Sequence, residues 1–244
     1  MFPGALAAFS QGLKEMGFVE GRNVDIEFRW ADGHYDRLRS LAAELADRNV
    51  SVIVAFDLPS AFAAKAATKT IPIVFSVGAD PVKVGLVESF SRPKANLTGM
   101  SVSSSVGGPK RVELLHELLP VVKAIALLGN PHHPNFPLDT PDIRAAADTL
   151  MQRFEPLAAS TESDLEAAFA TSALIVEPDP FFISQREQLV ELAARHKIPT
   201  IYPSRVFADV GGLISYGSSV GVSQPAGIYV GKILKGAKPA DLPI

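Results

Sequence analysis

Three aspartates in this sequence stand where acidic side chains could bind a ligand or transfer a proton. Asp57, Asp80 and Asp179 each follow a short apolar run within a few residues. A carboxylate at such a place can accept an ammonium group or sugar hydroxyls, or it can cap the next helix by accepting its first amide hydrogens. Capping is the commoner use, and the two roles are compatible. We therefore expect these residues to cap helices, and we keep all three as candidates for binding.

Aromatic and basic side chains near the same runs extend this set of candidates. Phe181, Tyr202 and Tyr216 could offer ring faces to an apolar or aromatic ligand, or they could pack in the core. Arg205 is the one basic residue that we expect close to these loops, so a ligand carboxylate would rely on Arg205 or on the helix amino-terminal amides of Ser60 and Ala61.

Several other kinds of chemistry find no support in the sequence. The chain has no cysteine, which excludes thiol catalysis and zinc–thiolate or iron–sulfur sites. His132 and His133 are adjacent, so their side chains point apart in an extended chain, and we expect an exposed loop and no metal. No glycine-rich phosphate loop and no Gly-x-Ser-x-Gly elbow occurs. We expect no cofactor and no catalytic residues.

The elements that must position these loops alternate between two periodicities. Apolar runs at 52–55, 73–75, 125–128 and 174–176 are apolar at every position, as in strands covered on both faces. Helical patterns lie between them, and Ser184 to Glu187 resembles a capping box that would open one of the later helices. The pattern predicts an α/β protein with parallel sheets between helices.

Length and composition agree with such a fold. The chain has 244 residues, 47% of them hydrophobic and 20% charged, and a formal net charge of −3. This balance supports a sizeable core and argues against nucleic acid as a main partner. No apolar run approaches the ~20 residues of a membrane helix, and the first residues do not form a secretory signal as written.

The strand–helix alternation runs twice, which predicts two Rossmann-like lobes. We expect residues 1–102 with 218–244 to form the first lobe and residues 103–217 to form the second, joined by a hinge. Ligands of open parallel sheets bind beyond the carboxyl ends of the strands. The predicted ligand-binding residues are therefore those of the strand-end loops: Asp57, Leu58, Pro59, Ser60, Gly78, Asp80, Asn130, Asp179, Phe181, Tyr202, Arg205, Tyr216 and Gly217.

Seven segments carry a resemblance to a known family. They are the sequences at 11–24, 28–33, 71–75, 80–81, 178–182, 198–203 and 229–236, which resemble ABC transporter substrate-binding proteins of the tryptophan/tyrosine type. The resemblance implies a periplasmic-binding-protein type I fold with a small ligand enclosed between the lobes. It also implies that relatives continue into a further strand before residue 3 and into a strand and helix after residue 244. Leu58 stands where relatives often carry a small hydroxyl residue.

The resemblance implies a function as the solute-binding component of an ABC import system. The ligand would be an amino acid or an aromatic compound, the partner a membrane permease, and the location periplasmic or extracellular at the membrane. Because a first strand would be absent from the sheet of lobe 1, a strand-exchange dimer is a further expectation. Two alternatives stay open: an enzyme using Asp57, Asp80 or Asp179 as acid and base, and an effector-binding regulatory domain of the same fold.

Overall fold

The computed structural model describes residues 3–93, 95–102, 107–217 and 223–244, which separate into two compact units. Unit 1 is Met1–Ser103 with Val220–Ile244, and unit 2 is Ser104–Ser219. The lobe boundaries predicted from the sequence, at 102/103 and 217/218, stay a prediction, because residues 103–106 and 218–222 lie outside the described residues. No described helix is long and apolar enough to cross a membrane.

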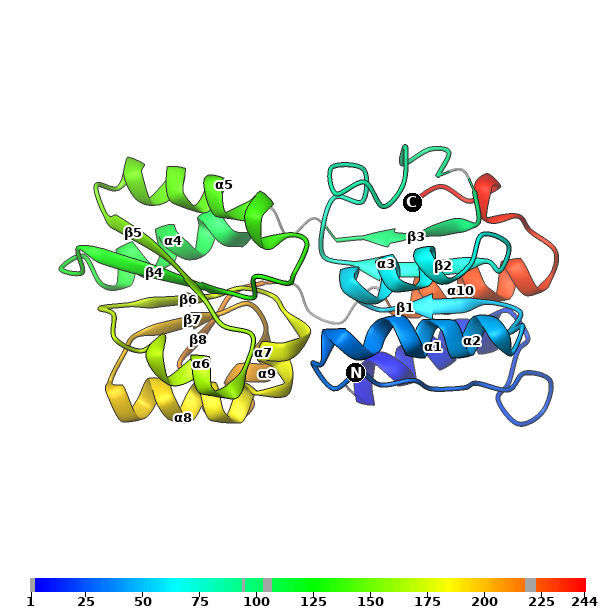
Figure 1. Cartoon of the computed structure of the whole chain (residues 1–244), viewed down its shortest axis with the longest axis horizontal. Helices are drawn as coiled ribbons and strands as arrows, with labels where there is room; N and C mark the ends of the chain where they lie inside the picture. Colours follow the sequence, from blue (N-terminus) through cyan, green and yellow to red (C-terminus); the bar gives the residue numbers. More distant parts are fainter. Residues whose placement is uncertain (1–2, 94, 103–106, 218–222) are drawn as a thin grey trace. The chain divides into compact units, whose positions relative to one another are not determined.

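Unit 1 is built around a sheet of three parallel strands in the order β1-β2-β3 (Figure 1). The elements of unit 1 are α1 (Pro3–Glu15), η1 (Tyr35–Arg37), α2 (Leu38–Asp47), β1 (Ile53–Ala55), α3 (Leu58–Ala67), β2 (Ile73–Val77), β3 (Leu97–Ser101), α10 (Ser223–Leu234) and η2 (Pro239–Asp241). β2 is buried at all five positions, as a strand covered on both faces must be.

The two faces of this sheet carry different helices. Ile73 and Phe75 pack with α3 and with Leu45 of α2, whereas Val74 packs with α1 and α10. Side chains of a strand alternate between the faces, so one strand supplies both cores. Thr98 of β3 also donates a hydrogen bond from its hydroxyl to the carbonyl oxygen of Leu242 (2.8 Å), which holds the carboxyl-terminal segment on unit 1.

Glycines allow α1 and α10 to pack at very short distance. A Cβ atom on Gly12 would lie 2.1 Å from the carbonyl oxygen of Gln224, and one on Gly227 would lie 2.2 Å from that of Phe9. Both distances are far below van der Waals contact, so any larger side chain would have to separate the two backbones. The two ends of unit 1's sequence therefore meet along an interface that requires glycine.

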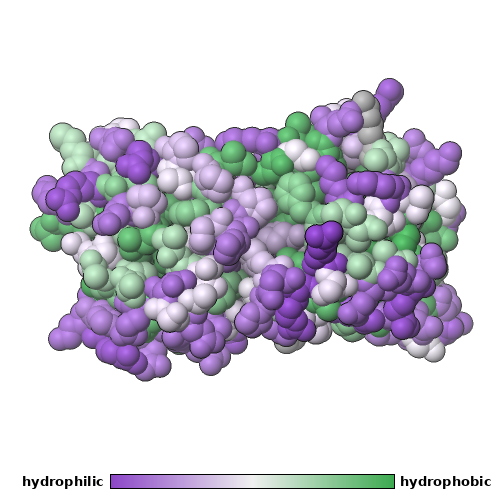
Figure 2. All heavy atoms as spheres, in the orientation of Figure 1, coloured by the Kyte–Doolittle hydropathy of each residue, from purple (hydrophilic) through white to green (hydrophobic). Residues whose placement is uncertain are grey.

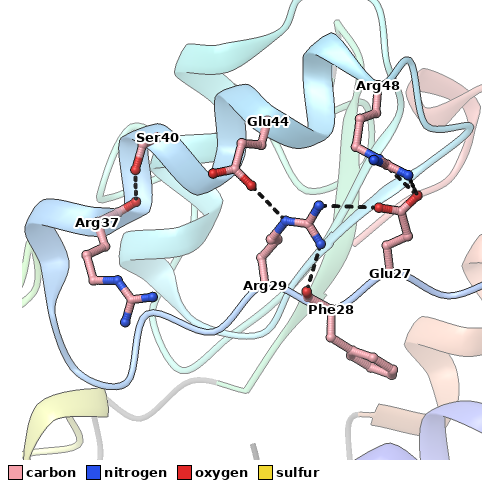
Figure 3. A network of polar contacts seen from close by, with 7 residues as sticks. All are labelled: Glu27, Phe28, Arg29, Arg37, Ser40, Glu44 and Arg48. Atoms are coloured by element: carbon pink, nitrogen blue, oxygen red, sulfur yellow. Dashed lines mark hydrogen bonds and ion pairs between the residues drawn. The ribbon is translucent and has the colours of Figure 1, made fainter.

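An extended segment of unit 1 is held by an ion-pair network instead of by strand pairing. The guanidinium of Arg29 contacts Glu44 of α2 at 3.0 Å and Glu27 at 3.4 Å, and Glu27 also pairs with Arg48 at 2.8 Å (Figure 3). These side chains are 25–57% exposed, so each pair contributes at most about 1 kcal/mol. The network therefore determines the path of the segment and adds little to the stability of unit 1.

The same segment alternates apolar and charged residues from Val24 to Trp30, a pattern typical of a half-buried strand. Residues 25–31 nevertheless form no ladder with any described strand. Ile26 packs against the core beside α1, while Phe28 and Trp30 stack on each other with centroids 5.5 Å apart and remain 41% exposed. Hydrophobic residues lie among hydrophilic ones on both units in the face drawn in Figure 2.

Unit 2 is built around a sheet of five parallel strands in the order β5-β4-β6-β7-β8 (Figure 1). The elements of unit 2 are α4 (Gly107–Leu118), β4 (Ala124–Gly129), α5 (Phe136–Thr149), β5 (Arg153–Ala158), α6 (Glu162–Ala167), β6 (Leu174–Val176), α7 (Pro180–Ser184), α8 (Arg186–His196), β7 (Thr200–Tyr202), α9 (Arg205–Ala208) and β8 (Ile214–Ser215). The alternating residues of β4 and β6 face α4 and α5 on one side and α6 to α9 on the other.

The predicted capping box at Ser184 to Glu187 is wrong. Ser184 is the last residue of α7, and its hydroxyl donates to the carbonyl oxygen of Phe181 three residues earlier (2.7 Å). The amino-terminal cap of α8 is Gln185, which makes no side-chain capping bond. Asp179 and Pro180 start a separate helical turn, so the chain is already helical where the box would have to begin.

Candidate functional site

Asp57 is the amino-terminal cap of α3 in unit 1. Its Oδ1 accepts the backbone amide of Ser60 at 2.7 Å, and its carbonyl oxygen accepts the Ser60 hydroxyl at 3.0 Å and the amide of Ala61 at 3.1 Å. The amides of Ser60 and Ala61 are therefore bonded to Asp57, and their binding of a ligand carboxylate stays a prediction. The sequence offered the cap and the anion site as alternatives, and the structure shows the cap.

The neighbouring predicted residues of unit 1 have local structural roles. Leu58 and Pro59 form the buried first turn of α3. Asp80 accepts the amides of Val82 (2.8 Å) and Lys83 (3.0 Å), which holds the turn after β2, and Gly78 in that loop is exposed. All of these residues follow the carboxyl ends of β1 and β2, so the structure brings the unit 1 candidates to one edge of one sheet.

In unit 2 a buried polar contact joins the ends of β4 and β6. Asp179 is 2% exposed, and its Oδ1 caps α7 by accepting the amides of Phe181 (2.7 Å) and Phe182 (3.4 Å). The same oxygen accepts Nδ2 of Asn130, just beyond β4, at 3.4 Å, and Oδ1 of Asn130 accepts the amide of His132 at 3.0 Å. Capping by Asp179, predicted from the sequence, is confirmed.

Two of the three predicted aromatic contacts lie in the core of unit 2. Tyr202 is 1% exposed and stacks on Phe207 with ring centroids 4.8 Å apart, and this burial raises the pKa of its phenol to about 12. Phe181 is also buried. Tyr216 is different, because 42% of it is exposed at the end of β8. Gly217 follows Tyr216, and a Cβ on Gly217 would lie 1.9 Å from the carbonyl oxygen of Pro203. Only glycine therefore fits at this position.

A basic residue that was not predicted lies at this edge of unit 2, besides the predicted Arg205. Arg205 points to solvent: its side chain is 84% exposed and pairs with Asp209 one turn along α9 at 3.3 Å. Arg111, in the second turn of α4, is instead 2% exposed, and its Nη1 donates to the carbonyl oxygen of Tyr216 at 3.3 Å. The sequence analysis missed Arg111, because one arginine in a polar helical turn carries no sign of burial.

Glu177 is the second residue that the sequence analysis missed. It follows β6 directly, is 4% exposed, and its Oε1 has no hydrogen-bond partner among the described residues; the same is true of Nε of Arg111. Burial raises the pKa of Glu177 to about 8, with the Asp139 and Asp179 charges adding to the shift and Arg111 opposing it. Burial likewise lowers the pKa of Arg111 to about 10. A carboxyl group and a guanidinium thus lie at one sheet edge, each with an unsatisfied hydrogen-bonding atom.

His132 and His133 occupy the loop after β4. His132 is exposed, and Nδ1 of His133 accepts the amide of Asn135 at 3.2 Å. Among the residues that the structure describes, no three histidine, aspartate or glutamate side chains are grouped so that they could hold a metal ion. Hydrogen bonds within the loop itself therefore account for its conformation.

Each unit has a parallel sheet with helices on both faces and polar residues at the carboxyl edge of the sheet. Two such units in one chain define a periplasmic-binding-protein type I fold. This confirms the predicted fold class. The family described as "ABC transporter substrate binding protein" matches this chain over residues 5–244. The chain belongs to this family, as the sequence motifs indicated.

Relatives of known structure or function agree with this membership. The chain is 28% identical to a tyrosine-binding protein of Clostridioides difficile (strain R20291), over 98% of this chain and 71% of the relative. The crystal structure of a conserved domain protein from Vibrio cholerae matches with a TM-score of 0.87 and 29% identity, over 98% of this chain and 84% of that one. A Streptococcus pneumoniae ABC domain in complex with L-Trp matches with a TM-score of 0.81 and 25% identity, over 100% and 85%.

Proposed function

We propose that this protein is the solute-binding component of an ABC import system and that its ligand is an aromatic amino acid or a closely related compound. The observation that carries the proposal is the family match over residues 5–244 together with two similar proteins whose names specify tyrosine and L-Trp. The identity of 25–28% supports the ligand class more than a particular ligand.

The ligand contacts that we propose lie on the loops that follow the strands. In unit 1 these are the loops after β1 and β2, with Asp57 to Ser60, Gly78 and Asp80, and in unit 2 they are the loops after β4, β6 and β8. The ligand can shift a conformational equilibrium only by its differential affinity for the two conformations. A membrane permease would then recognise the ligand-bound form, outside the cytoplasmic membrane.

Tyr216 is the aromatic residue that we propose as a ligand contact. Its ring is 42% exposed, whereas Phe181 and Tyr202 are fixed in the core of unit 2. An exposed ring at a strand end can stack on an aromatic ligand without breaking existing packing. Phe181 and Tyr202 would then act by positioning the loops instead of touching the ligand.

An enzymatic role for the same carboxylates receives no support from their contacts. Asp57, Asp80 and Asp179 each accept backbone amides that hold a helix or a turn, so each has a structural role without a substrate. Of the similar proteins, one is named a tyrosine-binding protein and another was crystallised in complex with L-Trp. We therefore propose binding without catalysis.

Thermal unfolding and calorimetry with purified protein test the proposal. L-tyrosine and L-tryptophan should each raise Tm, with L-lysine and L-glutamate as controls that do not. A ligand present at 100 times its Kd stabilises the folded state by about 2.7 kcal/mol, which is a shift of several degrees. If neither aromatic amino acid nor any aromatic acid raises Tm or gives a binding isotherm, the proposed function is wrong.

A further inference from the structure

Methionine supplies all the sulfur in this chain. The sequence has four methionines and no cysteine, so no thiol of the protein competes for an oxidant that transfers oxygen to sulfur. Met16, Met100 and Met151 are among the residues that the structure describes. Because the oxidant has to reach the thioether, the exposure of each side chain decides which of these three reacts first.

Met151 has different surroundings from the other two described methionines. It is 90% exposed. Met16 is half-buried, and a Cβ on Gly231 of α10 would lie only 2.3 Å from the Cβ of Met16 and 2.5 Å from its Cγ. Met100 of β3 is also half-buried and packs against the core cluster that contains Val74. An oxidant in solution therefore reaches Met151 without any movement of the protein, whereas packed neighbours shield part of the other two side chains.

The backbone holds Met151 at this exposed position. Its φ is 53°, in the left-handed region, and its amide donates to the carbonyl oxygen of Asp148 (3.0 Å) while the amide of Gln152 donates to that of Ala147 (3.0 Å). These two bonds form a Schellman motif at the end of α5, and its left-handed position is most often glycine. Gln152 is buried and donates its side-chain amide to the carbonyl oxygen of Val122 (3.1 Å). The turn is thus fixed on both sides of Met151.

We propose that Met151 is a site of reversible oxidation to methionine sulfoxide by hydrogen peroxide and other hydroperoxides. A lone pair of the thioether sulfur attacks one peroxide oxygen, so the S–O bond forms as the O–O bond breaks. The sulfur loses two electrons and the peroxide gains them. The departing hydroxide takes the proton of the transferred hydroxyl group and leaves as water. Methionine sulfoxide reductases reverse the change.

The oxidation acts on an apolar surface at the amino edge of the sheet of unit 2, the edge at which its strands begin. Val121, just before β4, is 81% exposed, and Leu118, the last residue of α4, is 56% exposed. Ala124 of β4 pairs with Arg153 of β5, so the turns that carry Val121 and Met151 lead into neighbouring strands. A sulfoxide is polar and makes this surface more hydrophilic. The added oxygen meets solvent and no core, so the fold should tolerate it.

Timed exposure of the folded protein to hydrogen peroxide, followed by peptide mapping with mass spectrometry, tests the proposal. The peptide that contains Met151 should gain one oxygen at least about tenfold faster than the peptides that contain Met16 and Met100. In urea-unfolded protein the three rates should converge, because the fold no longer shields any of them. Met151→Leu keeps an apolar side chain and should lose the fast oxidation. Met100→Leu is the matched control and should keep it.

The product has two further properties that can be measured. Protein oxidised at Met151 alone should keep its Tm within about two degrees, as for other changes at an exposed position. A mixture of the two stereospecific methionine sulfoxide reductases should restore the original mass.

Equal oxidation rates for the three methionines in the folded protein would overturn the proposal. So would a first oxidation that unfolds unit 2, or a sulfoxide at Met151 that the reductases cannot remove. Should circular dichroism show that Met151→Leu does not fold, the comparison of folded with urea-unfolded wild-type protein still decides.

Discussion

Glu177 makes the stability of ligand-free unit 2 depend on pH in the direction opposite to that of a salt-bridged carboxylate. Its pKa is about 8 in the folded protein, above the ordinary 4.5 that it regains on unfolding. Between these values the folded state binds more protons than the unfolded state, so the free energy of unfolding falls as pH rises. The contribution is fully present below pH 4.5 and is lost by about pH 8.

Glu177→Gln should remove this dependence. The amide cannot ionise, so the variant should gain stability over wild-type protein as pH rises from 5 to 8, by up to a few kcal/mol. Urea unfolding at a series of pH values measures the difference, with Glu155→Gln, which changes an exposed glutamate on β5 of the same unit, as the control. A constant difference between wild type and Glu177→Gln over this range would contradict a carboxylic acid held protonated by burial.

Single residues were predicted well where their chemistry acts on the adjacent backbone. Asp57 and Asp179 were expected to cap helices, and both do, because the capping signal lies within three residues of sequence. Arg111 and Glu177 were missed because their burial depends on strands and helices distant in sequence. The exposed position of the Arg205 side chain was not predicted for the same reason, since proximity to a strand end says nothing about which way a long side chain points.

At the scale of elements, the close contact between α1 and α10 predicts that one methyl group added at this interface destabilises unit 1. Gly227→Ala would place a Cβ 2.2 Å from the carbonyl oxygen of Phe9, a backbone atom that cannot move alone. The helices would have to separate, which costs about 1–3 kcal/mol or more. We expect Tm of unit 1 to fall by several degrees in differential scanning calorimetry.

Gly4→Ala is the control for this prediction, because it changes the same residue type in α1. No atom lies within 4 Å of the position of its added Cβ. Alanine favours helix over glycine by up to about 1 kcal/mol, so Gly4→Ala should leave stability unchanged or slightly raise it. Equal Tm values for the two variants would show that the interface yields to alanine.

Helices and wholly apolar strands were predicted from periodicity, and strands that contain polar residues or glycine were not. The apolar runs at 52–55, 73–75, 125–128 and 174–176 correspond to β1, β2, β4 and β6. β5 has a largely exposed sequence that includes Arg153 and Pro156, and it becomes a strand only by pairing with β4. β3 contains a threonine and a glycine and is absent from the apolar runs predicted as strands. In both strands tertiary pairing overrides weak local preference.

For the whole molecule, the open edge of β1 predicts self-association by strand pairing. Among the described strands β1 pairs with β2 alone, and exposed strand edges recruit other strands. The amide of Ile53 donates toward β2, so in a parallel ladder the amide of Val54 points to the open edge. We expect a concentration-dependent dimer, consistent with the strand exchange proposed from the sequence, measurable by light scattering after size exclusion.

Val54→Pro tests the edge directly. Proline removes the amide hydrogen at the open edge and leaves the bonds to β2, and edge strands tolerate proline. The variant should be monomeric at concentrations where wild-type protein is dimeric, with circular dichroism as the check on folding. A wild-type protein that stays monomeric at all concentrations, or a Val54→Pro variant that still dimerises, would contradict pairing at this edge.

Unit 1 is assembled from the two ends of the sequence, and unit 2 is one continuous stretch between them. Ala226, Val230 and Ile233 of α10 complete the core that Phe9 and Leu13 of α1 begin. On the ribosome, the amino-terminal helix is therefore made first but has to wait for more than two hundred residues of synthesis before its partner emerges. The middle of the polypeptide can close its own core in the meantime, so the order of translation and the order of folding are reversed for this chain.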